Sequence, residues 1–268
     1  VEEDGERFLR VSYPEGGVGT QLGGAQFKVP LKGSYEELYI SYRIRFREGF
    51  DFVKGGKLPG LCGGDCNTGG DVPDGTDGFS ARLMWRLEGK VVQYMYMPDQ
   101  ESQWGDNFYW YQGVGGQRSF EPGQWHQVQT RIVMNTPGQN DGVLQSWFDG
   151  VLALNRSDIR YRDVDTLALD TIYFSTFFGG SGDDWAPTAD EHVDFDEMVV
   201  STGPVPFDAS SGAVDCAALL VDWGGCDDGH ACTIDSCDAV TGCAHLPVDA
   251  VCVDSDLCDG EEVCDGVD

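Results

Sequence analysis

The sequence is poor in positive charge. Its 268 residues include 17 lysines and arginines against 46 aspartates and glutamates, which gives a formal net charge of -29. Such a surface repels phosphate backbones and anionic lipid headgroups, so we expect neither nucleic acid nor a membrane as a partner. An anionic ligand is not excluded, because a cleft can be locally basic on an acidic body.

Long apolar runs are also missing. No stretch approaches the ~20 apolar residues of a membrane helix, and the chain begins without the basic and apolar regions of a signal peptide. The ten cysteines are not arranged as the paired C-x-x-C groups of a zinc site. They favour disulfides in a secreted protein whose signal peptide has been removed. We expect no cofactor; the oligomeric state is left open, with a monomer as the simplest expectation.

The usual catalytic sets of hydrolases are lacking as well. A glycosidase needs two facing carboxylates, and the only suggestive pair, Asp194 and Asp196, lies in a strand-like run. Ser80 has no nucleophile-elbow context, and His126 and His192 lie in strand-like runs where structural histidines are common. The sequence therefore does not favour a hydrolase.

What the sequence does contain is a repeated β pattern. In residues 39–46, four apolar side chains alternate with four polar ones, and further short β-type runs occur at 91–97, 125–134, 144–154, 171–178 and 193–200. No stretch shows a sustained helical period. This pattern predicts an all-β protein, a two-sheet jelly-roll sandwich. The polar face that carries Arg43, Gln129 and Arg131 predicts a concave sheet that binds a ligand, and these three residues are candidate binding residues.

The composition changes after residue 208. Residues 209–268 hold 14 of the acidic residues, none of the basic ones and eight of the ten cysteines. Two copies of a small unit start at Cys226 and Cys252, and the second stops before its fourth cysteine. We therefore predict a jelly-roll domain over 1–208 and a truncated, disulfide-held acidic repeat segment over 209–268. Calcium or zinc binding is the alternative, but no EF-hand spacing occurs, and His230 and His245 stand alone.

Two cysteines lie outside that segment, in the run "LCGGDC". Cys62 and Cys66 could form a disulfide or a metal pair, and only Asp65 and Asp71 lie nearby as further ligands. The shortage of ligands favours the disulfide, and we expect no metal site here.

A set of polar residues between positions 54 and 96 is suited to a different chemistry. Lys54 and Lys57 lie in "KGGKLPG", which predicts an exposed glycine-proline loop. The pairs Ser80 and Arg82, and Tyr94 and Tyr96, each point to one side of a strand, since side chains two residues apart share a face. If these strands are neighbours, the lysine, arginine and tyrosine side chains converge.

Lysine, arginine and tyrosine without a carboxylate pair suit β-elimination on a uronic acid polymer. A cation stabilises the enolate-like charge that develops beside the sugar carboxylate. A base then removes the C5 proton and an acid protonates O4 of the departing sugar. One tyrosine can serve in both roles when nearby positive charge lowers its pKa.

The motifs "KGGKLPGLCGG", "SAR", "YMY" and "FSTFFGGSGDDWAP" resemble the polysaccharide lyase family 14 pattern over roughly residues 30 to 205. The resemblance implies a jelly-roll lyase of alginate or glucuronan. It implies Lys57 as the essential lysine, Ser80 and Arg82 as substrate contacts, and Tyr94 and Tyr96 as the pair at the cleavage point. We assign Lys54 to substrate attraction.

Two other functions stay open on the sequence alone. One is glucuronan cleavage, and the other is a non-catalytic carbohydrate-binding module on the same fold. Aromatic residues suit sugar stacking in either case; those considered are Trp85, Trp104, Tyr109, Trp110 and Tyr111. In mannuronate and glucuronate the C5 hydrogen and O4 lie on one side of the ring, so a single tyrosine can reach both. We therefore expect a preference for mannuronate-rich alginate over polyguluronate.

Overall fold

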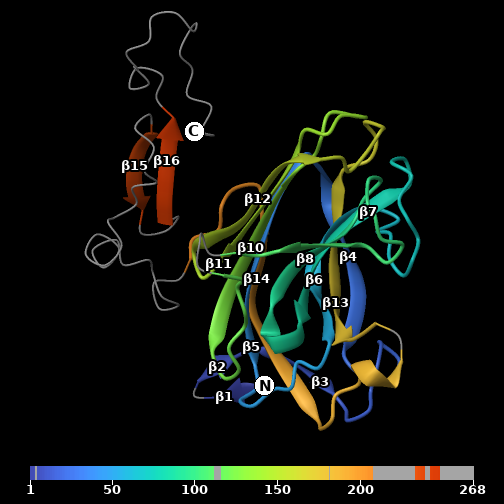
Figure 1. Cartoon of the computed structure of the whole chain (residues 1–268), viewed down its shortest axis with the longest axis vertical. Helices are drawn as coiled ribbons and strands as arrows, with labels where there is room; N and C mark the ends of the chain where they lie inside the picture. The colour runs from blue at the N-terminus through green and yellow to red at the C-terminus, as the bar shows by residue number, and fades with distance from the viewer. Residues whose placement is uncertain (4, 112–115, 181, 208–232, 239–241, 248–268) are drawn as a thin grey trace, which may run out of the picture. The chain divides into compact units, whose positions relative to one another are not determined.

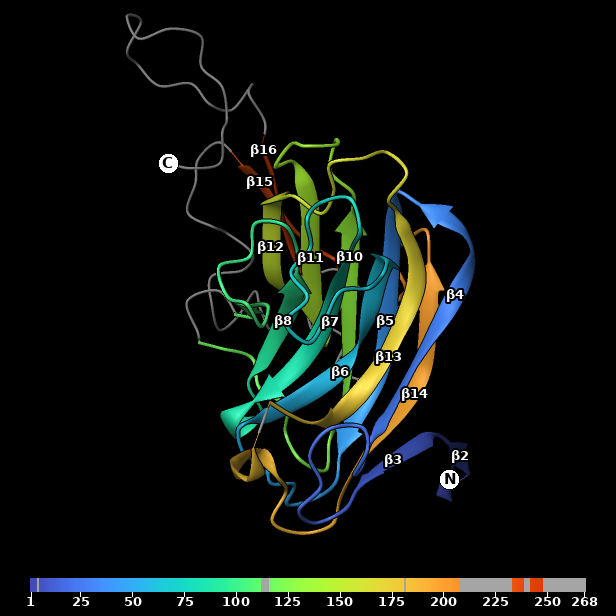
Figure 2. The same cartoon turned by 90° about the vertical axis from the view of Figure 1, so that its right-hand side faces the viewer.

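The protein folds as a jelly-roll sandwich, which confirms the predicted fold class. The computed structural model describes residues 1–3, 5–111, 116–180, 182–207, 233–238 and 242–247. One compact unit comprises Val1–Phe148 and Leu152–Val205, and in it two six-stranded antiparallel sheets pack face to face (Figure 1 and Figure 2). Within the described residues, no helix is long and apolar enough to cross a membrane.

The two sheets are named here after their central strands. The β5 sheet runs in the order β12 (Val151–Ile159), β11 (Gly142–Phe148), β10 (Trp125–Val133), β5 (Glu37–Phe46), β14 (Glu191–Ser201) and β3 (Leu9–Tyr13). The β6 sheet runs in the order β4 (Ala25–Tyr35), β13 (Leu169–Phe178), β6 (Gly55–Gly64), β7 (Gly78–Arg86), β8 (Val91–Tyr96) and β9 (Asp106–Tyr109). Short strands β1 (Glu2–Glu3) and β2 (Glu6–Arg7) pair with each other, and two 3-10 turns span Leu87–Gly89 and Asp183–Trp185.

The second unit contains one described hairpin, β15 (Thr233–Asp238) and β16 (Gly242–Pro247). Cys237 and Cys243 are directly opposite each other in its register. The other cysteines of the predicted repeats, and His230, lie outside the described residues. The disulfides and the boundary expected for this segment stay predictions.

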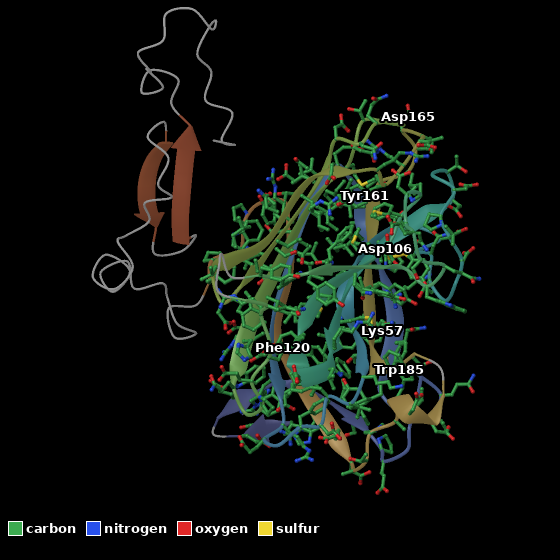
Figure 3. The ribbon with its side chains drawn as sticks, in the orientation of Figure 1. Lys57, Asp106, Phe120, Tyr161, Asp165 and Trp185 are labelled. Carbon is green, nitrogen blue, oxygen red and sulfur yellow. A yellow bond between two sulfur atoms is a disulfide. The ribbon has the colours of Figure 1, made fainter. Side chains whose placement is uncertain are left out.

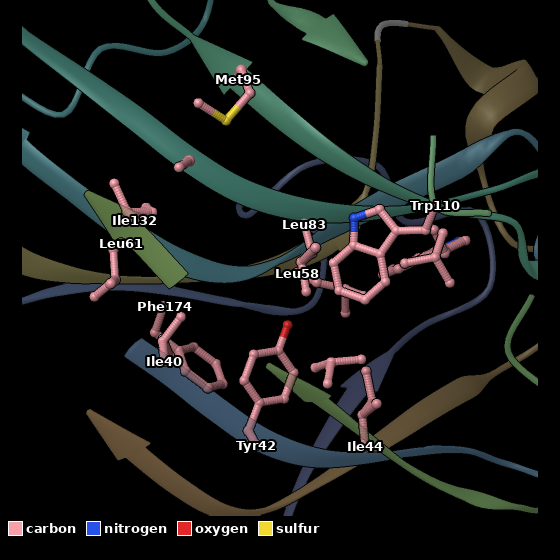
Figure 4. Close-up of a cluster of buried hydrophobic side chains, with 14 of the residues drawn as sticks. Ile40, Tyr42, Ile44, Leu58, Leu61, Leu83, Met95, Trp110, Ile132 and Phe174 are labelled. Atoms are coloured by element: carbon pink, nitrogen blue, oxygen red, sulfur yellow. The ribbon is translucent and has the colours of Figure 1, made fainter. Parts of the chain in front are cut away.

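The core lies between the apolar faces of the two sheets (Figure 4). The alternation in β5 is confirmed, because its apolar set is almost fully buried: Ile40, Tyr42, Ile44 and Phe46. The β6 sheet contributes Leu58, Leu61, Leu83, Trp85 and Met95 from the other side. Burying such side chains contributes roughly 1.5–3 kcal/mol each, so this layer fixes which face of each strand turns outward.

Strand β6 corrects one prediction: residues 55–60 of "KGGKLPG" are not an exposed loop but part of the third strand of the sheet, and only Lys54 lies outside it. A β-bulge lies at Pro59, where the pairing with β7 shifts between Leu58 and Gly60. Proline has no N–H to give to a strand ladder, so it is tolerated where the ladder is interrupted. Because of the extra residue, Leu58 and Leu61 both face the core. Their spacing of three residues differs from the two-residue period of a regular strand, so the sequence did not indicate a strand here.

The bulge leaves the Pro59 carbonyl facing the core, where the Tyr42 hydroxyl of the opposite sheet donates a hydrogen bond to it at 3.1 Å. Both groups are buried, and burial raises the pKa of Tyr42, so its hydroxyl stays protonated. This bond connects the β5 sheet to β6, the strand that carries Lys57.

The Cys62–Cys66 disulfide is confirmed, with the two Cα atoms 5.1 Å apart. It joins the end of β6 to the start of the loop 65–77. The metal-pair alternative for these two cysteines is thereby excluded.

Tyr42→Phe should lower the free energy of unfolding by about 1–3 kcal/mol, because it leaves the Pro59 carbonyl buried without its partner. Denaturant unfolding measures the change. Tyr109→Phe, which alters an exposed tyrosine, is the matched control and should stay within about 0.5 kcal/mol of the parent. Equal stability of the Tyr42→Phe and parent proteins would contradict a structural role for the cross-sheet bond.

Candidate active site

A cleft of about 450 Å³ opens on the outer face of the β6 sheet. Figure 3 shows Lys57 and Trp185 on this part of the molecule. Strands β6, β7, β8 and β9 form its floor, and the loop 65–77 and the segment after β13 form its sides. Its lining includes Lys57, Thr68, Arg86, Tyr94, Tyr96, Trp104, Asn107, Phe177 and Trp185.

Strand register brings five of the predicted residues to this face. Lys57 is opposite Met84, Arg82 is opposite Tyr94, and Ser80 is opposite Tyr96. Because cross-strand partners project to the same side of a sheet, the lysine, the arginine and both tyrosines gather over three adjacent strands.

None of the described residues provides Lys57 with a carboxylate partner. Its Nζ lies 3.9 Å from the centroid of the Tyr94 ring and 3.0 Å from Met84 Sδ. A ring face and a thioether are weak partners for an ammonium group. Burial lowers the pKa of Lys57 well below the ordinary 10.5, and the nearby charges of Arg82 and Arg86 lower it further. The site is therefore deficient in negative charge.

The two tyrosines differ in what their hydroxyls bond. Their rings meet edge to face with centroids 5.6 Å apart. Tyr94 donates its hydroxyl proton to the Trp104 carbonyl, whereas the Tyr96 oxygen accepts a hydrogen bond at 3.1 Å from the Gly70 N–H. The Tyr94 hydroxyl is therefore a donor in this structure, and the Tyr96 oxygen is an acceptor.

The expectation that positive charge lowers the phenol pKa does not hold for Tyr94. Burial raises the pKa of Tyr94, the neighbouring Tyr96 raises it further, and these effects outweigh the lowering by Arg82 and Arg86. Tyr94 is therefore a neutral hydroxyl in this structure.

Ser80 and Arg82 were expected to contact substrate, but neither lines the cleft. Both are almost fully buried. Ser80 Oγ donates to the Asn67 carbonyl at 2.7 Å, and Arg82 Nη2 donates to Thr68 Oγ1 at 2.6 Å. They hold the loop 65–77 against the sheet beneath the tyrosines.

Arg82 also needs the glycine at position 60. Its guanidinium carbon lies 4.7 Å from the Tyr173 ring, on the far side of β6, and Gly60 is the β6 residue between the two. A Cβ at Gly60 would come within 2.6 Å of the Arg82 Cα and 2.1 Å of the Ala81 carbonyl. A larger residue here would therefore force the strands apart.

Arg43, Gln129 and Arg131 do not join this cleft, because they lie on the β5 sheet. The two sheets pack through their apolar faces, so their polar faces turn to opposite sides of the sandwich. Each of the three is engaged there: Arg43 lies 5.0 Å from the Trp125 ring centroid, Arg131 pairs with Glu37 at 2.8 Å, and Gln129 accepts from the Val205 N–H.

The remaining predicted residues are also placed. Lys54 lies at the rim, where it pairs with Asp184 and lies 5.9 Å from the Trp185 ring centroid. Asp194 is buried and paired with Arg10 and Arg45, as a structural residue would be. Trp85 and Trp110 are fully buried and cannot stack on a sugar.

Sequence reasoning missed Arg86, Asn107 and Trp185. Arg86 donates to Asn107 Oδ1 and has no carboxylate partner among the residues that the structure describes. The signal for Arg86 was present, since it follows Arg82 by four residues on the same strand and so shares its face. Asn107 and Trp185 carried no comparable signal, because only the tertiary fold brings them to the cleft. Within the described ranges, no group of three or more histidine, cysteine, aspartate or glutamate side chains is placed to hold a metal ion.

Comparison with known proteins shows the family of the chain. The model of the family described as polysaccharide lyase 14 matches residues 1–198, and that of a Dictyostelium (slime mold) repeat matches residues 225–248. A comparison with curated proteins finds no match.

Several solved structures are similar to the chain. The alginate lyase Aly36B is 30% identical over 74% of this chain and 81% of its own, with a TM-score of 0.65. The PL-14 alginate lyase from Aplysia kurodai is 29% identical over 74% of this chain and 84% of its own, with a TM-score of 0.62. Alginate lyase vAL-1 from Chlorella virus, at 22% identity over 76% of this chain and 88% of its own and a TM-score of 0.62, shares the fold.

The family match covers most of the chain and coincides with the sandwich that carries the cleft. The chain therefore belongs to the polysaccharide lyase 14 family and is a polysaccharide lyase.

Proposed function

We propose that the protein is a secreted alginate lyase that cleaves mannuronate-rich chains by β-elimination. The observation that carries the proposal is the lysine of the cleft, which has no carboxylate partner among the described residues and lies on the ring of Tyr94. The similar proteins Aly36B and the Aplysia kurodai enzyme are named as alginate lyases. Their names support the choice of polymer.

Lys57 would bind the carboxylate of the sugar that loses its proton. Its weak partners, a ring face and a sulfur, are readily exchanged for a carboxylate, which forms a stronger, charge-assisted hydrogen bond. As the C5–H bond breaks, negative charge moves onto this carboxylate, and the ammonium group stabilises the transition state more than the ground state.

Tyr96 would act as the base and then as the acid. Its deprotonated oxygen, which the Gly70 N–H contacts, would take the C5 proton, and the electron pair would form the C4–C5 double bond as the C4–O4 bond breaks. The resulting phenol returns the proton to O4 of the leaving sugar. Tyr94, whose proton is already donated to the Trp104 carbonyl, would orient Lys57 and fill the cleft wall.

Ser80 and Arg82 would act indirectly. By fixing Asn67 and Thr68 they hold the loop 65–77, and this loop supplies the Gly70 N–H to Tyr96. The Cys62–Cys66 disulfide fixes the same loop at its beginning.

Tyr96→Phe should lower kcat on polymannuronate at least ~100-fold, because it removes the group that transfers the proton. Tyr94→Phe should have a distinctly smaller effect on kcat, because that hydroxyl does not transfer the proton. Ultraviolet absorbance of the unsaturated product measures both rates. Equal losses in the two variants would overturn the assignment of roles within the pair.

Lys57→Ala should also lower turnover at least ~100-fold, because it removes the charge that stabilises the enolate-like transition state. The side chain is half-buried at the floor of the cleft and contacts only a thioether and a ring face, so circular dichroism should show an unchanged fold. A folded Lys57→Ala protein with near-parental activity would exclude Lys57 from the chemistry.

The pH dependence should report the lowered pKa of Lys57. The protonated amine binds the uronate, so KM is low below the Lys57 pKa and rises as the pH increases through it, at a pH below the ordinary 10.5 of lysine. Lys57→Arg keeps its charge over this range, so its KM should stay level whatever its absolute value. A parental KM that stays level up to the ordinary lysine range would contradict the prediction.

Polymannuronate should be cleaved faster than polyguluronate. In guluronate the C5 hydrogen and O4 lie on opposite faces of the ring, so a second base across the sugar would be needed, and no histidine is among the described residues that line the cleft. Glucuronan, which differs from polymannuronate at C2, remains the alternative substrate. Initial rates on the three polymers decide between them, and faster cleavage of polyguluronate would refute the single-tyrosine mechanism.

A further inference from the structure

A second hollow of about 470 Å³ lies at the end of the β6 sheet where β7 turns into β8. Its lining is basic and aromatic, with two lysines, one arginine and two tyrosines; the residues are Lys54, Arg86, Leu87, Lys90, Asn107, Tyr109, Tyr111 and Gln117. We call it the basic hollow. Nothing in the proposed chemistry uses Lys90, Tyr109 or Tyr111.

The basic hollow adjoins the cleft, because Arg86 and Asn107 line both. Arg86 lies two residues beyond Met84, the partner of Lys57, so the hollow begins roughly 7 Å along the strand from the catalytic lysine. That distance is close to the length of one sugar unit in a polymer. A chain bound at Lys57 would therefore place a neighbouring unit over Arg86.

The charge of the basic hollow is only weakly compensated. Arg86 bonds a neutral amide, Asn107. Lys90 pairs with Glu88 and Lys54 with Asp184, in pairs whose acidic side chains are 69% and 62% exposed. Such surface pairs are worth about 0–1 kcal/mol, so an incoming carboxylate can replace the acidic partner with little loss.

A third hollow, which shares Asn107 and Tyr109 with the basic hollow, is opposite in charge. This acidic hollow is lined by four acids, Asp99, Glu101, Asp106 and Asp158, together with Arg156 and Arg160. Arg156 pairs with Asp158, and Arg160 with Asp99 and Asp163. An anionic polymer leaving the cleft would therefore be repelled by the acidic hollow and attracted by the basic hollow.

Aromatic side chains complete the basic hollow. Tyr109 and Tyr111 are 40% and 52% exposed, in a protein whose other tyrosines are mostly buried. Exposed rings beside cations are suited to a sugar, whose C–H face packs on a ring while its carboxylate meets the charge. A surface that binds no charged sugar would not need exposed aromatic rings beside cations.

We propose that the basic hollow is a uronate-binding subsite next to the catalytic cleft, in which Lys90 and Arg86 bind the carboxylate of a neighbouring sugar and Tyr111 packs on its ring. This inference rests on the proposed polyuronate lyase activity. The subsite binds substrate and takes no part in proton transfer.

The test uses two substitutions in the ion pair of Lys90 and Glu88, which should change KM in opposite directions. Lys90→Ala removes the cation and should raise KM for polymannuronate about tenfold, which corresponds to about 1.4 kcal/mol of binding. Glu88→Gln removes the competing carboxylate and should lower KM. In both variants kcat should stay within about twofold, because the subsite is remote from the reacting bonds.

Three controls separate a subsite from a general charge effect. Lys32→Ala removes an exposed cation from β4 of the same sheet and should leave KM unchanged. Lys90→Arg should retain the parental KM. Tyr111→Ala should raise KM for long oligomannuronates more than for the shortest one that is cleaved.

An unchanged KM in Lys90→Ala, or an equal rise in Lys32→Ala, would overturn the subsite while leaving the lyase activity intact. Absence of any unsaturated product from polymannuronate, polyguluronate and glucuronan with the parental protein would instead overturn the proposed function. The two failures are therefore distinguishable in one set of assays.

Discussion

The active site is organised around an unusual concentration of positive charge without carboxylate partners. In a chain with a net charge of -29, Lys57, Arg82 and Arg86 lie on two adjacent strands, and the described residues provide none of them with a carboxylate partner. Burial disfavours each charge, and the two arginines lower the pKa of Lys57. Such an arrangement is unfavourable for the free protein and becomes favourable when an anion enters. The cleft is built to bind a polyanion.

The fold maintains this arrangement through strand β6. The bulge at Pro59 shifts the register so that Leu58 and Leu61 face the core while Lys57 faces the cleft, and the Tyr42 hydroxyl bonds the carbonyl that the bulge leaves inside. Gly60 leaves room for Arg82 to reach Tyr173. The loop 65–77 is fixed by the disulfide, Ser80 and Arg82, and in turn presents the Gly70 N–H to Tyr96. Core packing and catalytic geometry are therefore coupled along a single strand.

Much of this could be predicted from the sequence, for physical reasons. Strict alternation in residues 39–46 predicted β5 and its buried face, and side chains two apart placed Tyr94 with Tyr96. The alternation of apolar and polar residues is interrupted by the bulge in β6, so the sequence of this strand resembled a loop. Pattern also cannot tell which outer face of a sandwich a polar residue occupies, which is why Arg43, Gln129 and Arg131 were grouped with the wrong sheet. Asn107 and Trp185 reach the cleft only through tertiary packing.

Equilibrium binding of a mannuronate oligosaccharide to the Tyr96→Phe protein tests the central claim most directly, because it separates binding from turnover. Calorimetry should show binding that weakens with added salt and that falls at least about tenfold, or 1.4 kcal/mol, when Lys57→Met is added. Equal affinity with and without the Lys57 charge would show that the uncompensated cations do not bind the uronate, and would contradict the account.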